Sequence, residues 1–275
     1  MSQGEPTSRR SLIAGSVGVA AAAAAAGITH CCGDHPVSAA PLDEGVRTPP
    51  VASDSLVTVA DDLHIHLRSD WGADLPPKGP LRPEDVRFLL VHHTASTSFN
   101  DTPRVAIRGV YAFHTGPQKR WPDVAYNFFV APDGSVWEGR AGSLDGPVEA
   151  SATGGNQGYS QLVCLLGNHV AVPPTAAAQA SLVRLLAWLA GRYELGVHRG
   201  AEATFVSRGS NKFPAGRTIT TPIISPHRAV TFTLCPGDAA IALLPEWRRR
   251  VYDTLSATWV RDGLQTGQRL DLERP

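Results

Sequence analysis

The sequence has no surplus of charge and little cysteine. Its 25 basic residues balance 25 acidic residues, which excludes the basic excess on which general electrostatic binding of nucleic acid depends. Four cysteines in 275 residues are too few for a disulfide-stapled scaffold. Charged residues make up only 18% of the chain and hydrophobic residues 43%, a composition that can build a core and excludes a disordered chain. The length indicates one or two domains.

The first forty residues, 1–40, indicate a targeting segment rather than part of the fold. Residues 8–13 read SRRSLI and open onto an Ala- and Gly-rich stretch that runs to Ile28. This pattern resembles a twin-arginine export signal. A membrane anchor is disfavoured, because the stretch is shorter than the roughly 20 strongly apolar residues that span a bilayer. We therefore expect a protein exported to the cell wall or the extracellular space, without a stable transmembrane span after processing. Lipid anchoring at Cys31 is the alternative.

The remaining residues divide into a linker, one domain and a tail. Residues 41–66 contain Pro, Ser and Asp with little periodicity, which indicates a linker. Residues 67–260 have the length of one domain, and residues 261–275 have the composition of a polar tail. Nothing in the sequence argues against a monomer, which is the state we expect.

Strand patterns occur at four places in this domain. They are short apolar or alternating runs, and they cover 88–91, 124–130, 135–138 and 161–166. The second and third flank Asp133-Gly134, a strong signal for a β-hairpin. Alternation along residues 124–130 predicts that Tyr126 and Phe128 share one face of the strand and that Asn127 lies on the other.

Three segments have helical patterns. Residues 103–114 follow a capping Thr102, begin with proline and end before a glycine. Residues 175–195 carry leucines at the spacing of a core-facing stripe. The last helix covers 238–259, and Pro245 is expected to bend or split it. Because strands and helices interleave, we expect an α/β fold of the mixed α+β kind, with a central, mainly β, sheet flanked by helices.

Two pairs of residues could bind a metal ion. His92 and His93 end the first apolar strand and point to opposite faces, so only one of them can face a given pocket. His227 lies eight residues before Cys235, a spacing that lets a loop return onto a bound ion. Imidazole and thiolate are ligands of zinc, and three protein ligands with one water form its catalytic arrangement. Each pair alone also fits a structural interpretation: a polar strand end, or a surface His near a buried Cys.

Six motifs then follow one another in a defined order. They are RSDWGA at 68–73, FLLVHHTA at 88–95, RWPDVAYNF at 120–128, DGSVWEGR at 133–140, LVCLLG at 162–167 and HRAVTFTLCPG at 227–237. Together they resemble the family of type 2 N-acetylmuramoyl-L-alanine amidases and peptidoglycan recognition proteins. The resemblance covers roughly residues 67–250 and implies a mixed α/β domain that binds one zinc ion.

The resemblance implies a ligand set for Zn²⁺. By motif match the ligands are His92, His227 and Cys235; His92 is preferred to His93 because family members carry the ligand directly after the apolar strand. Because a disulfide between Cys164 and Cys235 would consume the thiolate, we expect none.

The resemblance also assigns catalytic and substrate-binding roles. Tyr126 matches the family's catalytic tyrosine, and Thr233 falls where relatives carry Lys or Thr near the zinc. His114, Trp121 and His93 are candidate substrate-binding residues. The alternatives are a strand aromatic for Tyr126, a helix-dipole partner for His114, a core residue for Trp121 and a structural role for His93.

The implied activity is zinc-dependent hydrolysis of the amide between the lactyl group of N-acetylmuramic acid and L-alanine in peptidoglycan. Peptidoglycan or muropeptides are therefore the expected partners. One departure concerns the loop before LVCLLG, where Ser151 is the nearest occupant of a position at which the family often has His. The alternatives are a binding module of the same fold without catalysis, and a zinc peptidase acting within the stem peptide.

Overall fold

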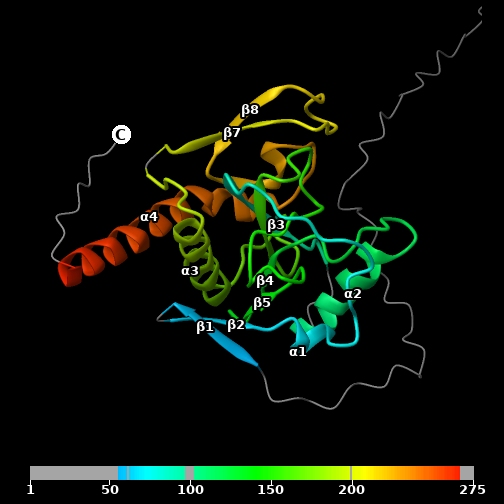
Figure 1. The fold of residues 1–275 in the computed structure, drawn as a ribbon, viewed down its shortest axis with the longest axis horizontal. Coiled ribbons are helices and arrows are strands. Elements are labelled where there is room, and N and C mark those ends of the chain that lie inside the picture. The colour runs from blue at the N-terminus through cyan, green and yellow to red at the C-terminus, as the bar shows by residue number, and fades with distance from the viewer. Residues whose placement is uncertain (1–54, 61, 97–101, 199, 267–275) are drawn as a thin grey trace, which may run out of the picture.

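A computed structural model describes residues 55–60, 62–96, 102–198 and 200–266, and in it a seven-stranded sheet lies between two groups of helices (Figure 1). This arrangement confirms the predicted mixed α/β fold. The predicted export signal and Cys31 lie outside the described residues.

The large sheet combines parallel and antiparallel strands. Across the sheet the strands are β1 (Leu56–Ala60), β2 (Leu63–His66), β5 (Val136–Glu138), β4 (Phe128–Val130), β6 (Ser160–Leu165), β3 (Phe88–His93) and β9 (Ile224–Pro226). The pairs β1–β2 and β4–β5 are antiparallel, and the other neighbours are parallel. The strands β6, β3 and β9 therefore present their carboxyl ends at one edge of the sheet.

Strand β3 is buried on both faces, which is why its sequence is almost continuously apolar. Leu89 and Val91 pack into the core cluster that includes residues of α3 (Ala176–Arg192) and α4 (Asp238–Thr266). Phe88 and Leu90 pack into the second cluster, on the opposite face. By the same alternation, His92 continues the second face of the strand.

The helices begin at the capping residues that the sequence indicates. In α2 (Pro103–Thr115) the Thr102 side chain accepts a hydrogen bond from the backbone N–H of Val105, and in α3 Thr175 accepts one from Ala178. Helix α2 and the short α1 (Ser69–Gly72) cover the second face of the sheet. Within the described part of the chain, no helix is both long enough and apolar enough to cross a membrane.

A separate two-stranded hairpin lies beside this sheet, formed by β7 (Glu202–Val206) and β8 (Thr218–Pro222), in yellow in Figure 1. Phe205 of β7 is almost fully buried and stacks on Phe88 at the start of β3, with 5.3 Å between ring centroids. This contact ties the hairpin to the second face of the large sheet.

Three predictions of element boundaries are wrong in part. The linker predicted over 41–66 ends before Leu56, because β1 and β2 pair with each other and β2 continues the sheet through β5. In β2 the fully buried Ile65 lies between two histidines, and β1 is largely exposed although it is mostly apolar, so neither short strand gives a clear pattern in the sequence. The last helix continues to Thr266, past the start of the predicted tail, and contains Pro245 without being split in two.

The third correction concerns the strand predicted over 124–130, of which only 128–130 forms β4. The backbone N–H of Asn127 still donates to the Leu162 carbonyl, but the Leu162 N–H donates to the side-chain oxygen of Asn127, so the regular ladder does not extend before Phe128. Tyr126 therefore shares a core cluster with Phe129, whereas Phe128 packs on the other face.

Candidate metal centre

Two histidines meet because their strands are parallel neighbours. His92 lies near the carboxyl end of β3, and His227 follows directly after β9, whose Pro226 pairs with Val91. His227 opens a short 3₁₀ helix, His227–Ala229, that turns its side chain back toward the sheet. The two imidazole rings are consequently 4.2 Å apart between centroids.

A loop then brings a thiol to the same place. We call residues 227–235 the metal loop. At its end the Cys235 Sγ lies 3.6 Å from His92 Nδ1 and accepts a hydrogen bond from the backbone N–H of His93 at 3.3 Å. Arg228 holds the two ends of the loop together, since its backbone N–H donates to the Cys235 carbonyl and its guanidinium donates to the Leu234 carbonyl.

The donor atoms suit a zinc ion. The ligand atoms of His92, His227 and Cys235 all lie within 4.8 Å of one another, and all three residues are buried. Neither His92 Nε2 nor either ring nitrogen of His227 has a hydrogen-bond partner in the described part of the chain. Buried polar atoms are rarely left unpaired, and two imidazoles with a thiolate are a zinc donor set. The residues present therefore fit this metal.

The protonation state of His92 agrees with that interpretation. Burial, reinforced by the neighbouring His227, His93 and His114, holds the pKa of His92 well below its usual value. The ring is therefore neutral at physiological pH, which is the form that binds a metal.

His93 faces the other way, as alternation along β3 requires. Its ring lies 6.2 Å from that of His169, and its Nδ1 accepts a hydrogen bond from the His169 backbone N–H. It lies on the face of β3 away from the His92 ring, so its placement gives no support to a contact with substrate at this centre. This placement favours the structural alternative for His93, and its substrate-binding assignment stays a prediction.

An aromatic cluster adjoins the histidines. The buried Tyr126 has its ring 5.1 Å from that of His92, and His114 at the end of α2 lies 5.4 Å from the Tyr126 ring. Trp121, which is half-buried, lies 4.9 Å from His114. The backbone N–H of Ala125 donates to His114 Nδ1, so the neutral His114 ring carries its proton on Nε2.

Thr233 lies within the metal loop. Its Oγ1 accepts a hydrogen bond from the backbone N–H of Cys235 at 3.2 Å, and the residue is half-buried. The hydroxyl thus lies against the main chain of the third donor. The other described cysteine, Cys164, is buried in β6 opposite His92, and both cysteines are free thiols.

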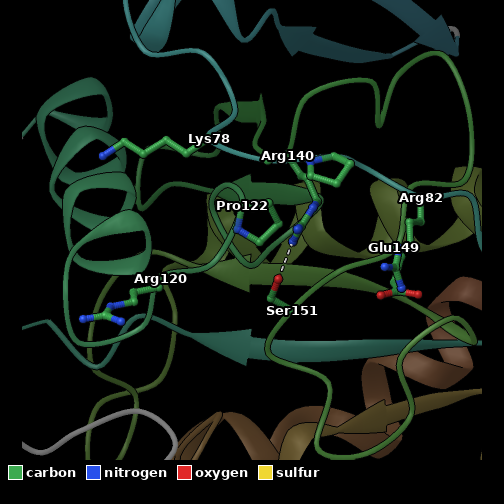
Figure 2. Close-up of a pocket in the computed structure, with 9 residues that line it drawn as sticks. Lys78, Arg82, Arg120, Pro122, Arg140, Glu149 and Ser151 are labelled. Atoms are coloured by element: carbon green, nitrogen blue, oxygen red, sulfur yellow. Dashed lines mark hydrogen bonds between the residues drawn. The ribbon is translucent and has the colours of Figure 1, made fainter.

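A basic cavity that the sequence did not indicate lies next to the segment of Tyr126. It has a volume of about 360 Å³ and is lined by Lys78, Gly79, Pro80, Arg82, Arg120, Pro122, Arg140, Glu149 and Ser151. Figure 2 shows Arg140 directed toward Ser151, whose hydroxyl accepts its hydrogen bond at 2.8 Å. The backbone N–H of Arg140 donates to the Tyr126 carbonyl, which joins the cavity wall to the aromatic cluster.

A mixed sheet between helices, with a His–His–Cys donor set at the carboxyl edge of its parallel strands, defines an α/β domain with a candidate zinc centre. The chain belongs to the N-acetylmuramoyl-L-alanine amidase family, whose sequence profile matches residues 82–238. The family predicted from the motifs is thereby confirmed.

Relatives of both expected kinds are similar to this chain. Human N-acetylmuramoyl-L-alanine amidase is 32% identical over 66% of the chain, which spans only 28% of that longer protein. Rat peptidoglycan recognition protein 1 is 31% identical, over 70% of the chain and 92% of the rat protein. The structure of human PGRP-IBETAC in complex with glycosamyl muramyl pentapeptide has a TM-score of 0.50 at 23% identity, covering 66% of this chain and 95% of the human one. The fold is thus that of the recognition proteins.

Proposed function

We propose that the protein is a zinc-dependent N-acetylmuramoyl-L-alanine amidase that cleaves the amide between the lactyl group of the glycan strand and the L-alanine of the stem peptide. The observation that carries this proposal is the complete donor set of His92, His227 and Cys235, buried beside Tyr126. Three protein ligands leave one coordination position for water or substrate. A module that only binds peptidoglycan has no chemical need of such a set.

The side chains around the donors supply the remaining chemistry. Zinc, when bound, supplies Lewis acidity and an activated water at neutral pH. Tyr126 and Thr233 are the proposed hydroxyl donors to the oxygen of the amide carbonyl as negative charge develops on it. Burial of Tyr126 against His92 restricts the orientation of its ring, so the donor needs little reorganisation during the reaction.

The remaining polar groups are suited to hold the substrate. His114 and Trp121 lie beside Tyr126 and are the proposed wall of the substrate site. Stem peptides carry carboxylates, which the adjoining basic cavity complements through Lys78, Arg82 and Arg120. The proposed partners are therefore peptidoglycan and muropeptides. Export, as residues 1–40 predict, would deliver the enzyme to a substrate outside the cytoplasmic membrane.

The first test is cleavage of purified peptidoglycan, with newly exposed L-alanine amino termini counted against newly exposed reducing sugars. The wild type is expected to release L-alanine termini alone, and a chelator is expected to abolish the release. Cys235→Ala is expected to lose both activity and zinc, because it removes the only thiolate donor of the set. Cys164→Ala is the matched control, since this buried cysteine lies outside the donor set, and it should retain activity.

The same experiment separates the alternatives. Retention of the wild type on peptidoglycan without cleavage would reject the enzyme and support the binding module. Termini other than L-alanine would instead indicate a peptidase acting within the stem peptide.

A further inference from the structure

The turn between β7 and β8, residues 207–217, forms a structured tip. We call it the hairpin tip. Its base is closed by hydrogen bonds from the Ser207 N–H to the Arg217 carbonyl and from the Gly216 N–H to the Ser207 carbonyl, both 2.8 Å. Within it, the Ser210 hydroxyl accepts from the backbone N–H groups of Lys212 and Phe213. The tip thus contains hydrogen bonds of its own in addition to those it makes with other segments.

The side-chain amide of Asn211 at this tip both donates a hydrogen bond to the metal loop and accepts one from it. Its Nδ2 donates to the Phe232 carbonyl at 3.0 Å, and its Oδ1 accepts from the Phe232 N–H at 2.8 Å. The same oxygen accepts from the Thr231 hydroxyl. One amide therefore satisfies both backbone groups of a residue that lies three positions before Cys235.

The neighbours of Asn211 extend this contact along the loop. Lys212 Nζ donates to the carbonyls of Arg228 and Ala229 at 2.8 and 2.9 Å. The Ser210 hydroxyl donates to the Val230 carbonyl at 3.0 Å. The carbonyls of residues 228, 229, 230 and 232 are therefore all bonded to side chains of the hairpin tip.

Burial holds only some residues of the metal loop. Val230 is buried in the core, but Phe232 is 56% exposed and Leu234 is 45% exposed, so residues 232–234, directly before Cys235, lie away from the hydrophobic core. A metal site requires its donors to be held to within about 0.5 Å. Hydrogen bonds from a rigid neighbour can supply the restraint that packing does not.

We propose that Asn211, together with Ser210 and Lys212, is a positioning element that holds the main chain between His227 and Cys235 in the shape that binds the metal. This inference rests on the proposed zinc site. These residues lie in the turn between β7 and β8 and act through the metal loop, so they are positioning residues and not ligands.

Asn211→Ala tests the proposal directly. Competition with a chromophoric chelator should show zinc affinity reduced about 10- to 100-fold, the usual effect of removing a group that orients a metal ligand. The urea midpoint of the metal-free protein should match that of the control. Thr220→Ala is the control, because Thr220 is exposed on β8 of the same hairpin and its position is away from the tip.

Hydrogen exchange gives a readout that needs no metal. In the metal-free protein, Asn211→Ala should accelerate exchange of the amides of residues 228–235, and of Phe232 above all, relative to Thr220→Ala. Asn211→Asp keeps the acceptor for the Phe232 N–H and loses the donor to its carbonyl. It should therefore give an intermediate effect on both zinc affinity and exchange.

Each outcome decides the proposal. Equal exchange and equal zinc affinity in Asn211→Ala and Thr220→Ala would overturn it. A wild type that binds no zinc would reject the proposed function, while the exchange comparison would still decide whether the tip holds the loop. If Asn211→Ala fails to fold, Lys212→Met, which removes two bonds to the same loop, is judged by the same two measurements.

Discussion

Single residues at the centre differ in what they contribute, and a change at Tyr126 can separate the proposed catalysis from the proposed metal binding. Its ring lies between those of His92 and His114, at 5.1 and 5.4 Å, but it is not one of the donors. Removing its hydroxyl leaves the ring packing in place. The effect of that removal therefore measures what the hydroxyl does during the reaction.

Tyr126→Phe is expected to lower kcat about 10²- to 10³-fold, the usual effect of removing one donor to a developing oxyanion. Zinc affinity should stay unchanged. The measurement is the rate of release of L-alanine termini, with zinc titrated in parallel. Tyr252→Phe, at an exposed position of α4, is the control. A rate within threefold of the wild type would exclude Tyr126 from the chemistry.

The sequence predicted the donors better than it predicted their surroundings. His92, His227 and Cys235 were identified because their motifs resemble those of a known family, and the structure brings them together. The role of Asn211 could not be predicted in this way. Its partners are backbone groups, which every residue possesses, and only the folded arrangement brings the hairpin tip to the metal loop.

At the scale of secondary structure, Gly237 joins the metal loop to α4. Its φ of +98° lies in the region that favours glycine, and a Cβ there would lie 2.1 Å from the carbonyl oxygen of His169. Helix α4 begins at Asp238, and any larger residue at position 237 would force the His169 main chain or the start of the helix to shift. The glycine therefore sets the approach of the helix to the site.

Gly237→Ala is expected to lower the free energy of unfolding by at least about 2 kcal/mol, because left-handed backbone alone costs ~1–2 kcal/mol for a residue with a Cβ and the contact with His169 adds to it. Urea denaturation measures the change. Gly196→Ala is the control, since an added Cβ there meets nothing within 4 Å. If Gly237→Ala lowered the free energy of unfolding no more than Gly196→Ala does, the close contact with His169 would not be important for stability.

Helices and strands with a strong pattern of apolar residues were predicted from the sequence, and those without such a pattern were missed. The apolar run of β3 and the capped helices α2 and α3 carry their own signals. Strand β1 is largely exposed and gives no burial pattern. The strands β7 and β8 pair across the long hairpin tip, which carries no short hairpin signal of the Asp-Gly kind.

At the scale of the whole molecule, Glu84 links stability to pH. It precedes β3, accepts a hydrogen bond from the Gln161 side chain of β6 at 2.6 Å, and its backbone N–H donates to the Pro147 carbonyl. Burial raises its pKa from 4.5 to about 8, with nearby Glu149 adding to the shift and the Gln161 hydrogen bond opposing it. The folded protein therefore holds a proton that the unfolded chain releases near pH 4.5.

The sign of the effect follows from linkage. The stability contributed by protonated Glu84 is fully present below about pH 4.5 and is lost as the pH rises to about 8. Glu84→Gln keeps an acceptor for Gln161 and cannot ionise. The free energy of unfolding of this variant, relative to that of the wild type, should therefore increase between pH 5 and pH 8. Urea denaturation at both pH values measures this, with the exposed Glu202→Gln as control. If the difference in free energy of unfolding between the variant and the wild type were the same at both pH values, the prediction would be refuted.

The donors are also far apart in the chain, since 143 residues separate His92 from Cys235. A chain that stops before Cys235 has two donors at most, so such a fragment cannot assemble the centre. A zinc ion that binds all three closes one loop around most of the domain and is lost when that loop opens. If the proposed zinc site is correct, metal binding therefore depends on a chain that reaches Cys235 and has folded so that the three donors meet.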